Sequence, residues 1–133
     1  MTNQLYGLGR EGFLAGDIDW DADDIKAVLI DTGVYIVSIN THNDEADLSG
    51  IIAESPNFST KTVTLGTADA ADITFTAATG ASVEAIVIFQ DTGTPATSRL
   101  IAYIDSATNL PVTPNGGNIT VSWDNGGDKI FTL

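Results

Sequence analysis

The most hydrophobic part of the chain is a pair of apolar runs separated by a short polar loop. Residues 83–89 (VEAIVIF) and 100–104 (LIAYI) are apolar at nearly every position. A strand with one face in solvent alternates apolar and polar residues, whereas a continuous apolar run bounded by turn residues indicates burial on both faces. Gly93 and Pro95 lie between the runs and favour a reversal of the chain. We therefore predict that 83–104 forms the central hairpin of a sheet covered on both sides.

Most of the remaining chain also carries short strand patterns. Residues 25–30 (IKAVLI) predict a further strand, and 34–39 a second strand or an extended edge. The polar segment 41–50 predicts a loop with one helical turn, and Pro56 makes 51–58 an edge or a turn. The other predicted strands are 61–65, 72–76, 118–123 and 129–133. The last two should form a hairpin through the Asp-Asn-Gly-Gly-Asp sequence at 124–128.

The N-terminal segment has a different period. Residues 3–15 place leucines, glycines and a phenylalanine at helical spacing, with Thr2 or Asn3 as a possible N-cap and Gly16 as the end. The internal glycines make this helix weak, so packing on the sheet must stabilise it. We therefore predict one domain, 1–133, that is mainly β: a β-sandwich or partly open barrel with a short N-terminal helix packed on it.

Composition limits the kinds of partner that this chain can have. At 133 residues without cysteine, it can bury a core of its own but has no disulfides or thiolate metal sites. Residues 1–16 lack the features of a signal peptide, and the apolar runs are too short to span a membrane. The net charge of −13 disfavours nucleic acid and anionic membranes as partners. It suits either solubility alone or a basic partner surface.

Four aspartates, at every second position of residues 17–23, suggest a calcium site. They match positions 1, 3, 5 and 7 of an EF-hand loop, but Ala22 replaces the glycine at position 6 and Val28 replaces the glutamate at position 12. The same spacing would line the solvent face of an extended segment, with Ile18 and Trp20 facing the protein. We expect this solvated face and keep a non-EF calcium site as the alternative.

No residue pattern predicts catalysis. His42 is the single histidine, and no nucleophile motif accompanies it. Residues 7–12 match the outline of a dinucleotide-binding motif, but no strand precedes them, so helix packing explains these glycines better. Trp20, Tyr103 and Trp123 could line a sugar platform, although we expect them in the core. We therefore predict no enzyme, and no catalytic, cofactor-binding or metal-binding residues.

Six blocks of the sequence carry a family resemblance: 10–20 (REGFLAGDIDW), 24–32 (DIKAVLIDT), 84–93 (EAIVIFQDTG), 100–105 (LIAYID), 110–117 (LPVTPNGG) and 121–124 (VSWD). Together they resemble a family of small structural proteins of tailed bacteriophage virions. The resemblance covers nearly the whole chain and is weakest from 34 to 58. It implies a capsid decoration (cement) protein or a piece of the tail and its fibres.

The charge helps to choose between these roles. Packaged DNA fills the capsid, so a protein with a net charge of −13 should lie on the outer surface. We expect a decoration protein that bridges subunits of the major capsid protein, without nucleic acid or membrane as partner. A homotrimer is expected because one short helix cannot cover a whole sheet face, which leaves a neighbouring subunit as the lid. The alternative is a tail or tail-fibre module that binds a host receptor or carbohydrate.

Overall fold

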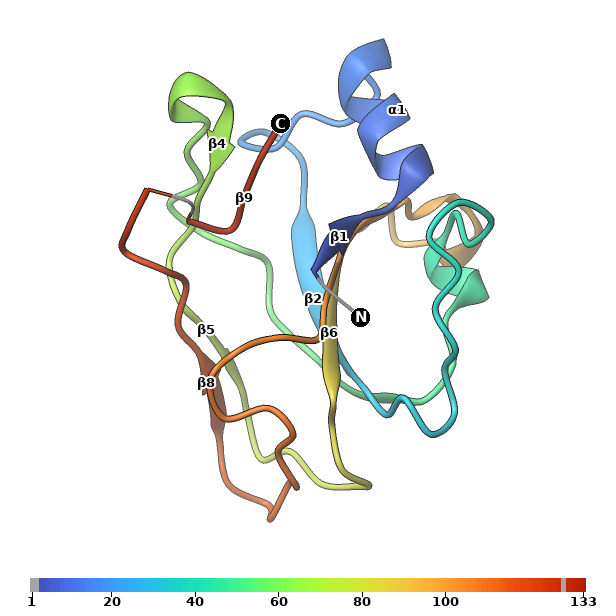
Figure 1. The fold of residues 1–133 in the computed structure, drawn as a ribbon, viewed down its shortest axis with the longest axis vertical. Coiled ribbons are helices and arrows are strands. Elements are labelled where there is room, and N and C mark those ends of the chain that lie inside the picture. The colour runs from blue at the N-terminus through green and yellow to red at the C-terminus, as the bar shows by residue number, and fades with distance from the viewer. Residues whose placement is uncertain (1–2, 128) are drawn as a thin grey trace.

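The computed structural model describes residues 3–127 and 129–133 (Figure 1). As predicted, the fold is mainly β, with one α-helix packed on an antiparallel sheet of several strands. A five-stranded sheet has the order β1-β7-β6-β2-β3, and two further strand pairs are β4-β9 and β5-β8. The elements are β1 (Gln4–Leu5), α1 (Gly7–Ala15), β2 (Ile25–Ile30), η1 (Glu45–Asp47), β3 (Ile51–Glu54), η2 (Thr64–Gly66), β4 (Thr67–Ala68), β5 (Ile73–Phe75), β6 (Ala85–Gln90), η3 (Pro95–Thr97), β7 (Leu100–Ile104), β8 (Ile119–Val121) and β9 (Phe131–Thr132), where η denotes a short 3-10 helix.

The predicted central hairpin is present and consists of β6 and β7, joined through η3. β6 lies in the middle of the five-stranded sheet and pairs with β2 along its whole length, from Ala85 opposite Ile30 to Gln90 opposite Ile25. Its side chains point alternately to two separate cores, so that Ile88 lies on one face and Phe89 on the other. Both are fully buried, which confirms that this sheet is covered on both sides.

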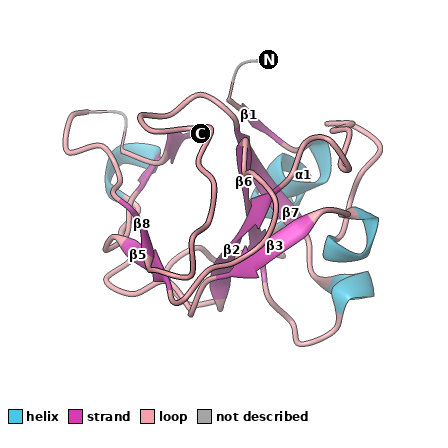
Figure 2. Ribbon diagram, turned by 90° about the horizontal axis from the view of Figure 1, so that it is seen from below, coloured by secondary structure: helices cyan, strands magenta, loops and turns pink. Residues whose placement is uncertain are grey.

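The first core lies between the five-stranded sheet and the two small strand pairs, which face it in a sandwich-like arrangement (Figure 2). The Trp20 and Phe131 rings pack edge to face with centroids 5.3 Å apart, and Phe58 packs in tilted contact with Trp123 at 5.6 Å. Such aromatic pairs bury large areas and prefer these tilted geometries. The first core therefore includes the two tryptophans that the sequence placed there.

The second core lies on the opposite face and is covered by the chain itself. Residues 31–50, here called the covering segment, supply Tyr35, Val37 and Leu48 to this face, and Tyr6 joins them from the start of α1. The expectation that a neighbouring subunit must act as a lid is therefore wrong. The covering segment contains no regular strand, so the strand expected at 34–39 is absent, but η1 supplies the helical turn expected at 41–50.

The N-terminal helix is shorter than predicted. It begins at Gly7, with Tyr6 as the N-cap in an extended conformation, and Asn3 does not cap it. Thr2 lies outside the described residues. The preceding residues instead pair with β7, Leu5 opposite Ala102, because a strand at the sheet edge satisfies their backbone groups better than a glycine-rich helix start. Gly16 ends the helix as predicted, in a left-handed conformation with φ of 80°.

Two predicted β segments form differently. Residues 61–65 make a single bridge, Thr62 to Asp69, and then turn into η2. The prediction of a hairpin through 124–128 is wrong, because β8 pairs with β5 and β9 pairs with β4. Residue 128 itself lies outside the described residues. The Trp123 backbone N–H donates to the Asp72 Oδ1 at 3.0 Å, which ties the chain just after β8 to the residue before β5.

Candidate functional site

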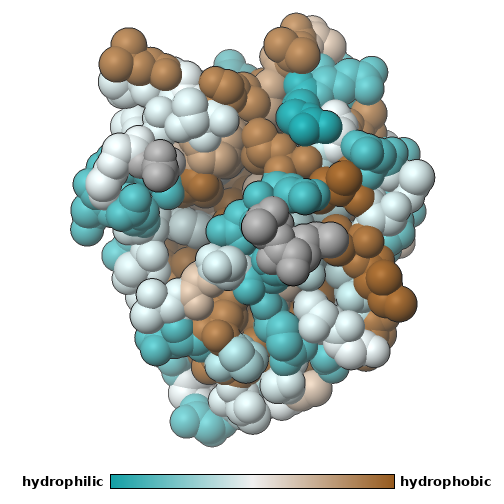
Figure 3. All heavy atoms as spheres, viewed as in Figure 1, coloured by the Kyte–Doolittle hydropathy of each residue, from teal (hydrophilic) through white to brown (hydrophobic). Residues whose placement is uncertain are grey.

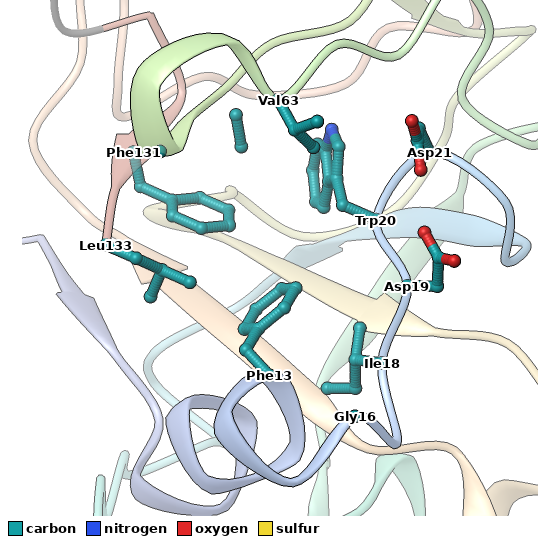
Figure 4. A pocket seen from close by; sticks show the side chains of 11 residues that line it. Phe13, Gly16, Ile18, Asp19, Trp20, Asp21, Val63, Phe131 and Leu133 are labelled. Atoms are coloured by element: carbon teal, nitrogen blue, oxygen red, sulfur yellow. The ribbon is translucent and has the colours of Figure 1, made fainter.

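A cavity of about 310 Å³ opens between α1, the 18–21 segment, η2 and β9. The rings of Phe13, Trp20 and Phe131 line it, and the aliphatic side chains of Val63 and Leu133 stand at its edge (Figure 4). We call this site the aromatic pocket. It joins segments from both ends of the chain, so no single stretch of the sequence could have revealed it.

Packing and one hydrogen bond fix the walls of the aromatic pocket. The Trp20 indole Nε1–H donates to the Asp69 carbonyl at 3.1 Å, which sets the ring's orientation. Phe131 is in contact with Trp20 on one side and with Phe13 on the other, with ring centroids 5.3 and 5.8 Å apart. Ile18 and Trp20 point inward, as the alternating sequence predicted. The pocket is therefore formed before any partner arrives.

Exposed aliphatic side chains lie on the segments that form the aromatic pocket. Val63 and Leu133 line it and are 49% and 60% exposed, and Leu65, which lies in η2 between the lining residues Val63 and Gly66, is 96% exposed. Leu14, beside Phe13 in α1, is 89% exposed. Figure 3 shows apolar atoms gathered along the upper edge of the molecule, over η2 and over α1. A cluster of exposed apolar side chains beside a cavity is typical of an interaction surface. Sequence reasoning missed this rim.

Acidic side chains border the same pocket. Asp19 and Asp21 lie on the outer side of the 18–21 segment, away from the rings (Figure 4). Hydrogen bonding to Asp21 raises the pKa of Asp19 above its ordinary value. The other two aspartates have their own partners, because Asp17 pairs with Arg99 at 3.1 Å and Asp23 accepts the Asp19 N–H at 2.8 Å. In the described part of the chain, no group of three His, Cys, Asp or Glu side chains could hold a metal ion.

Removing calcium should leave the stability of the folded chain unchanged. A chelator lowers the melting temperature only when the folded state binds the ion, and Asp17 and Asp23 are held by Arg99 and Gln90. We expect a shift of less than about 1 °C in thermal melts with and without chelator. A clear fall on chelation would instead identify Asp17, Asp19 and Asp21 as ligands.

A second cavity of about 610 Å³ lies at the edge of the first core, beneath the 106–112 loop. Its described walls are mostly aliphatic and amide or hydroxyl side chains, with Asp124 and Lys129 as the charged groups. His42, the histidine of the sequence, does not line this cavity.

His42 lies at the edge of the second core, where its ring contacts Tyr35 with centroids 5.3 Å apart. Its Nδ1 accepts the Ser38 N–H at 3.2 Å and lies 2.8 Å from the Tyr35 hydroxyl. The Tyr35 hydroxyl in turn lies 2.9 Å from that of Tyr6. These hydrogen bonds anchor the covering segment to the start of α1. They place no serine hydroxyl or cysteine thiol beside the imidazole.

The other candidate residues are also structural. Trp20, Trp123 and Tyr103 are 3%, 8% and 4% exposed, so they form no sugar platform. In the 7–12 motif, Gly9 packs directly on the backbone of β7. Helix packing thus explains this glycine, as predicted.

Tyrosine ionisation should report on the second core. Burial raises the pKa of Tyr6, Tyr35 and Tyr103, and these are all the tyrosines of the chain. A group whose pKa is higher in the folded state stabilises the fold below its unfolded pKa, about 10, and loses that contribution as the pH rises above it. We expect tyrosinate absorbance to appear above about pH 10 together with unfolding, measured in parallel by tryptophan fluorescence. Titration of tyrosines near pH 10 in a protein that stays folded would contradict this.

Comparisons with known proteins do not assign this chain to a family. No protein-family model matches the sequence, and no curated protein is significantly similar to it. Within residues 3–127 and 129–133, none of the helices combines the length and the apolar character that a membrane span requires.

Proposed function

We propose that this protein is a structural protein of a tailed-bacteriophage virion, which decorates the outer capsid surface and bridges subunits of the major capsid protein. The observation that carries the proposal is the preformed aromatic pocket with its exposed aliphatic rim, on a chain with a net charge of −13. This combination suits binding to a protein surface. The resemblance of six sequence blocks to virion proteins supplies the biological setting.

The charge supports an outer position. Packaged DNA is a dense polyanion, and a chain with 18 acidic and 5 basic residues gains nothing from contact with it. On the outside, the same charge would complement basic patches of the capsid and speed the encounter. Attachment that depends on charge weakens as salt is added, because exposed charges are screened beyond about 8 Å at physiological ionic strength.

We further propose that the protein acts as a homotrimer. Both sheet faces are already covered, so trimer contacts must use exposed apolar residues outside the aromatic pocket, for example Val34 or Ile51. Each added copy brings a further net charge of −13, so like-charge repulsion opposes assembly. Higher salt should therefore strengthen the trimer while it weakens attachment to the capsid.

The test combines purified capsids with light scattering. Expanded and unexpanded capsids prepared without this protein are mixed with it and sedimented at a series of salt concentrations. We expect binding to expanded capsids only, release at high salt, and a trimer in solution that strengthens with salt. A monomer at every salt concentration that never binds expanded capsids would overturn the proposal. Glycan or host-cell binding by such a monomer would identify a tail-fibre module instead.

A further inference from the structure

We propose that the aromatic pocket docks one apolar side chain from a partner protein, on a segment that carries lysine or arginine beside that side chain. The inference rests on the proposed function only for the identity of the partner, the capsid protein. The chemistry of recognition is argued from the pocket itself, in terms of its size, its rim and its charge.

The size and lining of the pocket suit a side chain better than a small-molecule ligand. Its volume of about 310 Å³ is at the lower end of the range of ligand sites. Ligand sites also contain a few converging polar groups that orient the molecule. Here the Trp20 indole N–H is already donated to the Asp69 carbonyl, and the carboxylates of Asp19 and Asp21 lie outside the aromatic walls (Figure 4). An aliphatic or aromatic side chain would meet mostly apolar surface inside.

The rim contains a leucine that folding does not explain. Leu65 is 96% exposed, so it contributes almost nothing to either core. Its backbone has a φ of 54°, a left-handed conformation that side-chain-bearing residues rarely adopt. A glycine would take this conformation without strain, as the next residue, Gly66, does at a φ of 78°. Strained residues cluster at active sites and ligand clamps, and Leu65 lies in the chain between Val63 and Gly66, which both line the pocket.

The charge around the pocket selects a basic partner over a second copy of this chain. Asp19 and Asp21 border the opening, and no lysine, arginine or histidine of the described chain lines it. A second copy seated there would bring further acidic surface, from a chain with a net charge of −13, against these carboxylates. Lysine or arginine beside the docked side chain would instead pair with them. The same side chains that repel a copy thus attract a basic segment.

The first experiment is an NMR titration of the full chain with two matched peptides, acetyl-Lys-Leu-Phe-Lys-amide and acetyl-Glu-Leu-Phe-Glu-amide. We expect the basic peptide to shift the Trp20 indole signal and the methyl signals of Val63 and Leu133. It should bind about tenfold more tightly than the acidic peptide at low salt, and the difference should shrink at high salt. Equal binding of both peptides, or no shift at these residues at millimolar peptide, would overturn the proposal.

Three variants separate docking from folding. Leu65→Gly should keep or raise the denaturant midpoint, because glycine adopts the left-handed backbone conformation without strain. The same substitution should weaken binding of the basic peptide several-fold. Asp19→Asn combined with Asp21→Asn should remove the preference for the basic peptide. Ile36→Ala, the matched control, truncates an aliphatic side chain that is 82% exposed in the covering segment, and it should leave peptide binding unchanged.

The outcomes also distinguish the docking inference from the proposed function. Self-association that shifts the same pocket signals without any peptide would make a second copy the occupant and overturn the inference. If neither peptide reaches the pocket but the chain binds expanded capsids, and the Leu65→Gly variant does so equally well, the docking inference alone fails. If the basic peptide docks as expected but capsids are never bound, the proposed function alone fails.

Discussion

Replacing Phe89 with alanine is expected to lower the free energy of unfolding by about 3–5 kcal/mol. Phe89 is fully buried in the second core and lies on β6, the middle strand of the five-stranded sheet. It is paired with Leu100 on one side and Lys26 on the other, so the sheet cannot collapse into the space left by the ring. Denaturant melts followed by tryptophan fluorescence measure the change.

Two further variants serve as a buried comparison and an exposed control for Phe89→Ala. Ile88→Ala removes a fully buried side chain from the opposite face of β6, and should cost about 2–5 kcal/mol. Ile36→Ala removes a side chain that is 82% exposed, and should change stability by less than about 0.5 kcal/mol. A change below about 0.5 kcal/mol for Phe89→Ala would place its ring outside the core and contradict a sheet that is covered on both sides.

The sequence predicted the central strands because their pattern allows no other burial. Apart from Lys26 and Glu84, the runs 25–30, 83–89 and 100–104 are apolar at every position. Their strands β2, β6 and β7 lie in one sheet, which buries most of these residues. The predicted strand at 72–76 also forms as β5, and its alternation buries Ile73 and Phe75. In these elements, local pattern and tertiary burial agree.

The short segments could not be predicted because their partners lie far away in sequence. Residues 61–65 alternate like a strand, but η2 forms there, and β4 directly after it pairs with β9 from the end of the chain. The Asp-Asn-Gly-Gly-Asp sequence at 124–128 favours a hairpin locally, yet β5 is the strand that pairs with β8. The covering segment shows the same limit, since Tyr35 is buried through contacts with Tyr6 and Tyr103 and without a strand.

The candidate site could be predicted only in part. The alternating pattern at 17–23 predicted that Ile18 and Trp20 face the protein and that the aspartates face solvent. In the structure, Ile18 and Trp20 form one wall of the aromatic pocket, and Asp19 and Asp21 form its acidic border. The opposite wall comes from Phe131 at the other end of the chain. The pattern at 61–65 predicts that Leu65 belongs to a strand, whereas the structure places it in η2 with its side chain 96% exposed.

Gly9→Ala should destabilise the protein although alanine is the better helix former. Alanine in a helix interior is about 1 kcal/mol more favourable than glycine in the free energy of helix formation, so helix propensity alone predicts a more stable α1. In the structure, however, a Cβ added at Gly9 would lie 2.6 Å from the Leu100 carbonyl oxygen and 3.0 Å from the Ile101 Cα. These are backbone atoms of β7 and cannot move aside alone. We expect a net loss of about 1–3 kcal/mol in the free energy of unfolding.

Gly12→Ala is the matched control, because it makes the same change in the same helix against softer neighbours. A Cβ at Gly12 would lie 2.7 Å from the Ile18 Cδ1 and 3.0 Å from the Arg99 Nη1, which are ends of side chains that can rotate. Its cost should therefore be smaller than that of Gly9→Ala in the same denaturant melts. If Gly9→Ala instead raised stability by about the 1 kcal/mol that propensity gives, α1 would not pack this closely on β7. The wall that Phe13 contributes to the aromatic pocket would then lose the support of the sheet beneath it.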